Sequence, residues 1–145
     1  MKDSLEREMV LAAPRDKAWV ALTDPAHVAE WFGSEGEIDL RPGGAIMFGW
    51  PGFGRFYGVV VEADPRQRFS YRWCLDRETR VDAGATTLVE FTLEDAPGGT
   101  RLKLVESGFA SLPEETRDRH LSDNTRGWEE ELAKLAKQIE AAAGS

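Results

Sequence analysis

Residues 111–141, SLPEETRDRHLSDNTRGWEEELAKLAKQIEA, decide the fold that the sequence predicts. Within them, large side chains recur at steps of three and four residues, which places them on one face of a helix. This face consists of Leu121, Thr125, Trp128, Leu132, Leu135 and Ile139. Ser111 precedes Glu114 by three residues, the spacing of a capping box at a helix start. We therefore expect one long amphipathic helix over about residues 112–141, with an apolar face that another element must cover.

Gly127 interrupts this helix directly before Trp128. A glycine in a helix interior destabilises it by up to about 1 kcal/mol relative to alanine. Two interpretations remain open from the sequence: the glycine costs stability without a benefit, or another group packs closely against it.

Upstream of the helix, short strand-like segments alternate with turn sequences rich in proline and glycine. Two short helices are expected after the first strand, one opened by Pro14 and one capped by Asp24 before Pro25. Because short turns join consecutive strands, the sheet must be antiparallel. The prediction is one α+β domain over residues 1–145, with the long helix on one face of the sheet. The expected strands are residues 1–12, 37–40, 45–50, 53–63, 69–75, 86–94 and 101–107.

The composition is that of a globular chain and excludes several classes of function. The 145 residues carry a net charge of −8, which argues against binding to nucleic acid or to anionic lipid. The single cysteine, Cys74, excludes an internal disulfide and a cysteine-rich zinc site. No apolar stretch is long enough for a secretion signal or a membrane span. We expect a cytoplasmic protein without stable membrane insertion.

Strand alternation assigns one face of three strands to the interior. Two interpretations of this face compete: a solid aromatic core, or a cavity lined by rings with a few polar groups, which is typical of ligand sites. The inward residues are expected to be Phe69, Tyr71, Trp73, Val89, Phe91, Leu93, Leu102, Leu104 and Glu106.

Glu106 is the one ionisable residue in this otherwise apolar set, and an isolated buried charge is too costly to keep. In one interpretation it pairs with Arg7 on the first strand and orients the polar end of a ligand. In the other it stays unpaired and acts as an acid–base catalyst. His27 and His120 lack the spacing of metal ligands, so we expect both to be surface or structural residues and predict no metal site and no cofactor. Cys74 is expected to be a small packed residue.

Three sets of motifs resemble the family of homologues of the activator of heat-shock protein 90 ATPase, within the START-like (SRPBCC) superfamily. The first is APRDKAWVALTDP at 13–25, followed by WFG at 31–33. The second is GVVVE at 58–62, followed by DPR at 64–66 and YRW at 71–73. The third comprises GTRL at 99–102, ESGF at 106–109 and GW at 127–128. The resemblance implies a helix-grip fold: a curved antiparallel sheet of about seven strands around the C-terminal helix, with a hydrophobic cavity between them.

The resemblance implies several functions, because relatives include a co-chaperone domain, lipid carriers, antibiotic-sequestering proteins and cyclases. Many members carry a histidine three residues before the Gly-Trp pair, where this chain has Asn124. Asparagine can form hydrogen bonds but cannot titrate, which weakens any acid–base role for that position. The family's name also suggests chaperone activation and a stress response.

We therefore predict a non-catalytic protein, a monomer or a homodimer, that binds a small apolar or aromatic molecule. Glu106 and Asn124 would recognise a polar end of that molecule. The alternatives are a cyclase- or hydratase-type enzyme that uses Glu106, and a chaperone activator. The predicted ligand-binding residues are Trp31, Phe48, Tyr71, Trp73, Phe91, Leu104, Glu106, Asn124 and Trp128.

Overall fold

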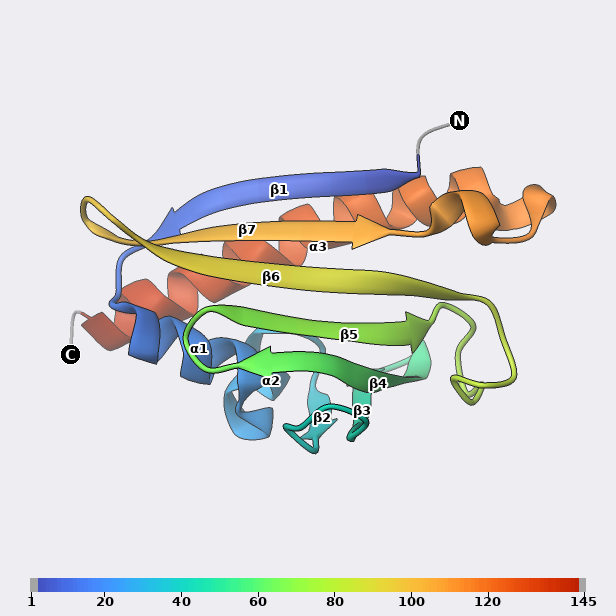
Figure 1. Ribbon diagram of the computed structural model, residues 1–145, viewed down its shortest axis with the longest axis horizontal. Coiled ribbons are helices and arrows are strands. Elements are labelled where there is room, and N and C mark those ends of the chain that lie inside the picture. The colour runs from blue at the N-terminus through green and yellow to red at the C-terminus, as the bar shows by residue number, and fades with distance from the viewer. Residues whose placement is uncertain (1–2, 144–145) are drawn as a thin grey trace.

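The computed structural model describes residues 3–143 and shows a seven-stranded antiparallel sheet with a long helix across one face (Figure 1). The strand order is β1-β7-β6-β5-β4-β3-β2, so every consecutive pair from β2 to β7 is also a spatial neighbour. The elements are β1 (Ser4–Leu11), α1 (Arg15–Thr23), α2 (Pro25–Trp31), β2 (Glu35–Ile38), β3 (Ala45–Trp50), β4 (Gly54–Asp64), β5 (Arg68–Cys74), β6 (Thr86–Ala96), β7 (Gly99–Ser107), the 3-10 helix η1 (Phe109–Ser111) and α3 (Glu114–Ala143).

This architecture confirms the predicted helix-grip α+β fold. The sheet is curved, and α3 lies on its inner side, where Figure 1 shows it passing behind β7 and β6. The two short helices follow the first strand as expected, and Asp24 caps α2 by accepting a hydrogen bond from the backbone N–H of His27 at 3.3 Å. The apolar stripe of α3 is buried from Trp128 to Ile139, which anchors the helix on the sheet.

Several expected boundaries differ from the structure by about two residues, among them those of the second strand and of the long helix. The second strand lies at Glu35–Ile38, two residues earlier than expected, because these residues pair with β3 in the register Glu35↔Gly49. The capping box at Ser111 is absent, because Ser111 ends the 3-10 helix and α3 begins only at Glu114. The carbonyl of Pro113 opens α3 by accepting from the N–H groups of Thr116 and Arg117.

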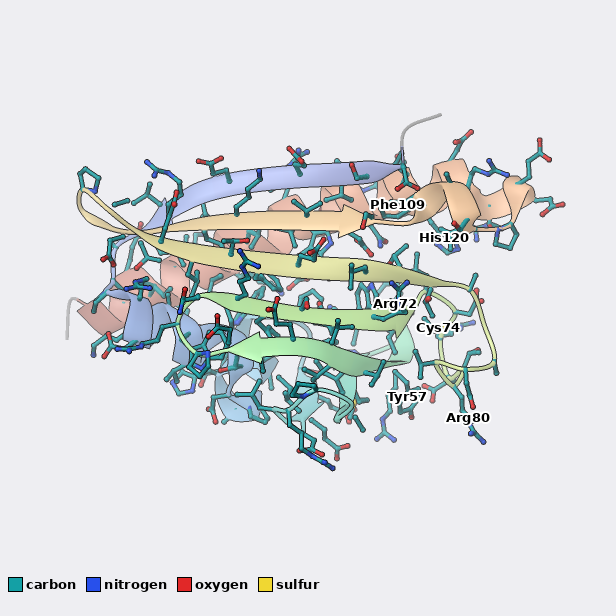
Figure 2. The ribbon with its side chains drawn as sticks, in the orientation of Figure 1. Tyr57, Arg72, Cys74, Arg80, Phe109 and His120 are labelled. Carbon is teal, nitrogen blue, oxygen red and sulfur yellow. The ribbon has the colours of Figure 1, made fainter. Side chains whose placement is uncertain are left out.

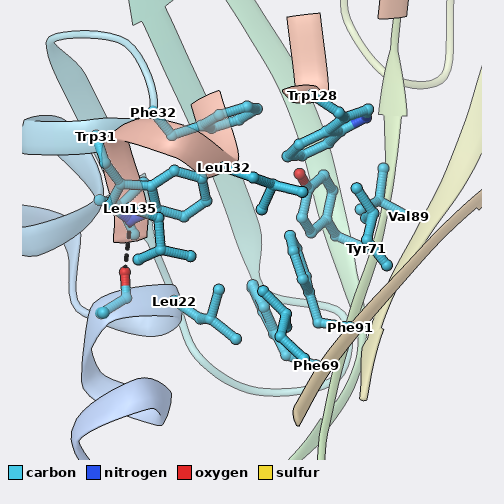
Figure 3. Packing of buried hydrophobic residues seen from close by; sticks show 14 of the residues in the cluster. Leu22, Trp31, Phe32, Phe69, Tyr71, Val89, Phe91, Trp128, Leu132 and Leu135 are labelled. Atoms are coloured by element: carbon cyan, nitrogen blue, oxygen red, sulfur yellow. Dashed lines mark hydrogen bonds between the residues drawn. The ribbon is translucent and has the colours of Figure 1, made fainter. Parts of the chain in front are cut away.

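Aromatic rings fill the middle of the space between sheet and helix (Figure 3). Phe32 inserts there directly after α2 and stacks on Trp128, with ring centroids 4.8 Å apart and planes 7° from parallel. Gly33 makes this insertion possible: its φ is +76°, and a Cβ there would lie 2.4 Å from the carbonyl oxygen of Gly49. The chain can therefore turn sharply after Phe32 and enter β2.

Trp31, the neighbour of Phe32, locks the two short helices together. Its indole N–H donates to the carbonyl of Ala21 on α1 at 2.8 Å, the bond drawn in Figure 3. Among residues 3–143, none of the helices has both the length and the apolar character that a membrane crossing needs.

Candidate functional site

A pocket of about 410 Å³ opens at one end of the space between α3 and the sheet. Its walls come from the first half of α3, from the ends of β3, β4 and β5, and from the residue that follows α2. The apolar lining consists of Phe32, Trp50, Phe53, Phe56, Trp73, Leu75 and Trp128, and the remaining lining residues are Arg119, His120, Asp123, Asn124, Gly127 and Glu131.

The inner wall of the pocket is a set of mutually packed rings. Trp73 lies 5.8 Å from Phe32 and 6.3 Å from Trp128, measured between ring centroids. Trp50 makes an edge contact with Phe32 at 4.8 Å and with Phe56 at 5.5 Å. Each ring is held by at least two others, so the wall is formed before any ligand arrives.

Glu106 lies immediately behind this wall, on β7, with no exposed surface. Its Oε2 accepts from the indole N–H of Trp73 at 2.9 Å and from the hydroxyl of Thr87 at 2.5 Å. Its Oε1 accepts from the indole N–H of Trp128 at 2.8 Å. The side-chain amide of Asn124 donates to both oxygens, at 3.0 and 3.2 Å. The buried carboxylate of Glu106, on β7, is thus hydrogen-bonded to β5, to β6 and to two positions of α3.

The donors around Glu106 indicate an ionised carboxylate. The two indole N–H groups can only donate, and they occupy one lone pair on each oxygen. Hydrogen bonds from neutral donors therefore stabilise the buried charge. The expected pairing of Glu106 with Arg7 is wrong. The side chain of Arg7 lies on the helix side of β1, and it pairs with Glu129 of α3 instead.

The structure separates the predicted ligand-binding residues into two groups. Trp73, Asn124 and Trp128 line the pocket. The other six are buried next to it or in the core, and the pocket surface does not include them: Trp31, Phe48, Tyr71, Phe91, Leu104 and Glu106. Tyr71 points its hydroxyl toward Trp128 (Figure 3), and burial, followed by the nearby Glu106 carboxylate, raises its pKa well above the ordinary value.

Sequence reasoning missed the polar residues that α3 contributes to the pocket, namely Arg119, His120, Asp123 and Glu131. The signal was present, because His120, Asn124, Gly127 and Glu131 follow one another at steps of three and four. This second stripe lies beside the apolar stripe and has no apolar side chains to reveal it. Figure 2 shows His120 at the end of the molecule that also carries Cys74 and the loop between β5 and β6.

Gly127 lies at the centre of this second stripe, and the interpretation in which another group packs closely against it is wrong. A Cβ at this position would meet no atom within 4 Å, so nothing packs against the glycine. The space in front of it belongs to the pocket. The absence of a side chain here leaves room on the helical wall.

His120 is partly buried at the pocket, and its surroundings favour the neutral ring. Burial lowers the pKa of His120 below its ordinary value, and the neighbouring Arg119 lowers it further. Nearby negative charges raise the pKa, but not enough to reverse the shift; they belong to Asp76, Asp123 and Glu106. The pocket therefore presents an uncharged imidazole at neutral pH.

The shift at His120 predicts a pH dependence of stability. The pKa of His120 is lower in the folded than in the unfolded protein. The contribution of the neutral ring to the free energy of unfolding is therefore complete above the unfolded pKa of about 6.5. It is lost as the pH falls through the folded pKa. The difference in free energy of unfolding between wild type and His120→Gln should therefore change across this range. Urea denaturation at several pH values measures it, and a constant difference would contradict the assignment.

The described residues offer no obvious metal centre, since no three His, Cys, Asp or Glu side chains among them are grouped to hold an ion. Cys74 is buried on the opposite face of β5 from Trp73. A Cβ at Gly84 would lie 2.6 Å from its Sγ, so the loop between β5 and β6 packs on the thiol. Burial raises the pKa of Cys74, which makes a thiolate nucleophile unfavourable.

Solved structures with the same fold cover almost the whole chain. Protein MLL2253 from Mesorhizobium loti superposes with a TM-score of 0.82 at 24% identity, over 95% of this chain and 97% of that one. DynU16, a putative protein in the dynemicin biosynthetic locus, superposes with a TM-score of 0.80 at 25% identity, over 98% of this chain and 49% of that one. CalU16 from Micromonospora echinospora superposes with a TM-score of 0.72 at 27% identity, over 94% of this chain and 75% of that one.

No curated protein matches the chain significantly in sequence. A family model does match, over residues 12–140, and this range includes every residue that lines the pocket. Its description is Activator of Hsp90 ATPase homolog 1-like protein. The motifs of the sequence, the helix-grip fold and this match agree, and the chain belongs to the family of Activator of Hsp90 ATPase homolog 1-like proteins.

Proposed function

We propose that the protein, as a monomer or a homodimer, binds a small apolar or aromatic molecule in the pocket beside α3 and does not transform it. The observation that carries this proposal is the pocket of about 410 Å³ with preformed aromatic walls. This volume is in the range of small-molecule sites, and such sites combine apolar walls with a few placed polar groups. Here Asn124 is the polar group of the inner wall.

Two further points support a ligand-binding role. Gly127 keeps the helical wall open at a position where most residues would favour the helix more strongly. DynU16 shares the fold at 25% identity and is a putative protein in the dynemicin biosynthetic locus, which fits a fold that handles small organic molecules.

The hydrogen bonds around Glu106 argue for a structural rather than a catalytic role. A general acid or base must reach the substrate directly or through one water. Glu106 lies behind the pocket wall, and donors from this chain occupy both of its oxygens. The chaperone-activator alternative rests on the description of the family and on no residue of the pocket.

Binding of a neutral fluorescent probe, N-phenyl-1-naphthylamine, tests the proposal. We expect saturable quenching of tryptophan emission together with a rise in probe emission, because Trp50, Trp73 and Trp128 line the pocket. Leu75→Gln should weaken binding severalfold by placing an amide in the apolar wall. Val61→Gln is the matched control, because Val61 lies on β4 outside the pocket and is 46% exposed. Equal affinities for the two variants, or no saturation with wild type, would refute the proposal.

A further inference from the structure

Three hydrogen-bond donors of the inner wall point at Glu106 and away from the ligand space. Trp73, Asn124 and Trp128 are the three lining residues that touch Glu106, and each does so through its only N–H-bearing group. The two indoles have no other polar atom. Of these three side chains, only Asn124 therefore keeps a polar atom that a ligand could use.

Glu106 also fixes which atom of Asn124 remains available. An ionised carboxylate only accepts, so the amide nitrogen must face Glu106 and the side chain cannot be flipped. The free atom is the carbonyl oxygen Oδ1, to which no group among residues 3–143 donates. Between Trp73 and Trp128, whose indole N–H groups are occupied by Glu106, the pocket thus offers a hydrogen-bond acceptor.

The negative charge of Glu106, behind the pocket wall, also influences which ligands can bind. Glu106 brings a negative charge close to the pocket, and none of its described hydrogen-bond partners is a cation. In an environment of low dielectric such a charge repels an anionic group more strongly than it would in water. An anionic end would therefore be placed at the open rim, next to Arg119, and not at the inner wall.

We propose that Asn124, held by Glu106, selects neutral aromatic ligands that carry a hydrogen-bond donor, such as a phenolic hydroxyl or an aromatic N–H group. This inference rests on the proposed function and specifies its ligand class. Asn124 is the specificity-determining residue, because it touches the ligand. Glu106 is a positioning residue, because it acts through the orientation of the Asn124 amide.

Three naphthalenes that differ in one substituent test this selectivity by competition with N-phenyl-1-naphthylamine at pH 7. We expect 2-naphthol, which is neutral and donates, to bind about three- to tenfold more tightly than 2-methoxynaphthalene, which only accepts. 2-Naphthoate, an anion, should bind more weakly than 2-naphthol. Because this comparison uses the wild-type protein, its test of the selectivity does not depend on whether any variant folds.

The variant Asn124→Leu assigns the preference to one residue. It removes the acceptor, so the affinities for 2-naphthol and 2-methoxynaphthalene should become equal within about twofold. Thr125→Val is the matched control, since the Thr125 hydroxyl donates to the carbonyl of Leu121 within α3 and does not line the pocket. This control should keep the preference for 2-naphthol.

The outcomes separate the two proposals. If wild type binds all three naphthalenes equally, or prefers 2-methoxynaphthalene or 2-naphthoate, the selectivity is overturned and the pocket function stands. A preference for 2-methoxynaphthalene or 2-naphthoate would indicate that a donor elsewhere, such as the indole N–H of Trp50, dominates recognition. If neither the probe nor any naphthalene binds, the proposed function itself fails, and the selectivity fails with it.

Discussion

Replacing Glu106 with leucine will lower the free energy of unfolding by about 4 kcal/mol or more. The substitution introduces an apolar side chain of similar size and removes the acceptor of four buried or half-buried donor groups, on Trp73, Thr87, Asn124 and Trp128. An orphaned buried donor costs about 1–3 kcal/mol, and four donors lose their acceptor at once. Urea denaturation followed by far-ultraviolet circular dichroism measures the loss.

Glu106→Gln provides a milder test of the same network. Its amide oxygen still accepts, but its NH₂ group meets donors, so the loss of stability should lie between those of wild type and Glu106→Leu. The control is Glu129→Ala, which breaks the ion pair with Arg7 at half-exposed positions and should cost less than about 1 kcal/mol. A loss for Glu106→Leu no larger than that for Glu129→Ala would show that the network does not hold the pocket wall.

The fold was predictable because its main signals are local. The stripe on residues 111–141 and the alternation of Phe69, Tyr71 and Trp73 each follow from one element and its period. The inward position of Glu106 followed from the same alternation. Its partners did not, because they come from β5, β6 and α3, and no local rule states which inward side chains meet.

The location of the pocket was predictable only in part. The sequence predicts a space between sheet and helix, but the packing of rings decides where that space stays empty. Phe32 stacks on Trp128 and closes the middle, which leaves Phe48, Tyr71 and Phe91 in the core. A turn at Gly33 sends Phe32 inward, and this depends on a contact with Gly49 some sixteen residues later. Such a contact has no signature in the sequence around either glycine.

Replacing Gly127 with leucine should have opposite effects on stability and on ligand binding. Leucine favours a helix interior more than glycine does, so the free energy of unfolding should rise by about 0.5–1 kcal/mol. The same side chain would extend into the pocket between Asn124 and Glu131, where a Cβ meets no atom within 4 Å. We expect the affinity for N-phenyl-1-naphthylamine to fall at least about tenfold, which is about 1.4 kcal/mol of binding free energy.

A reciprocal pair of exchanges on the same helix separates the two effects. Gly127→Ala should gain nearly the same stability as Gly127→Leu but lose little affinity, because a methyl group takes up little of the pocket. Ala133→Gly, at an exposed position away from the pocket, should lose up to about 1 kcal/mol and leave the affinity unchanged. If binding instead followed stability across the three variants, the pocket in front of Gly127 would not be where the probe binds. If Gly127→Leu bound the probe as tightly as wild type, the glycine would have no role in ligand access.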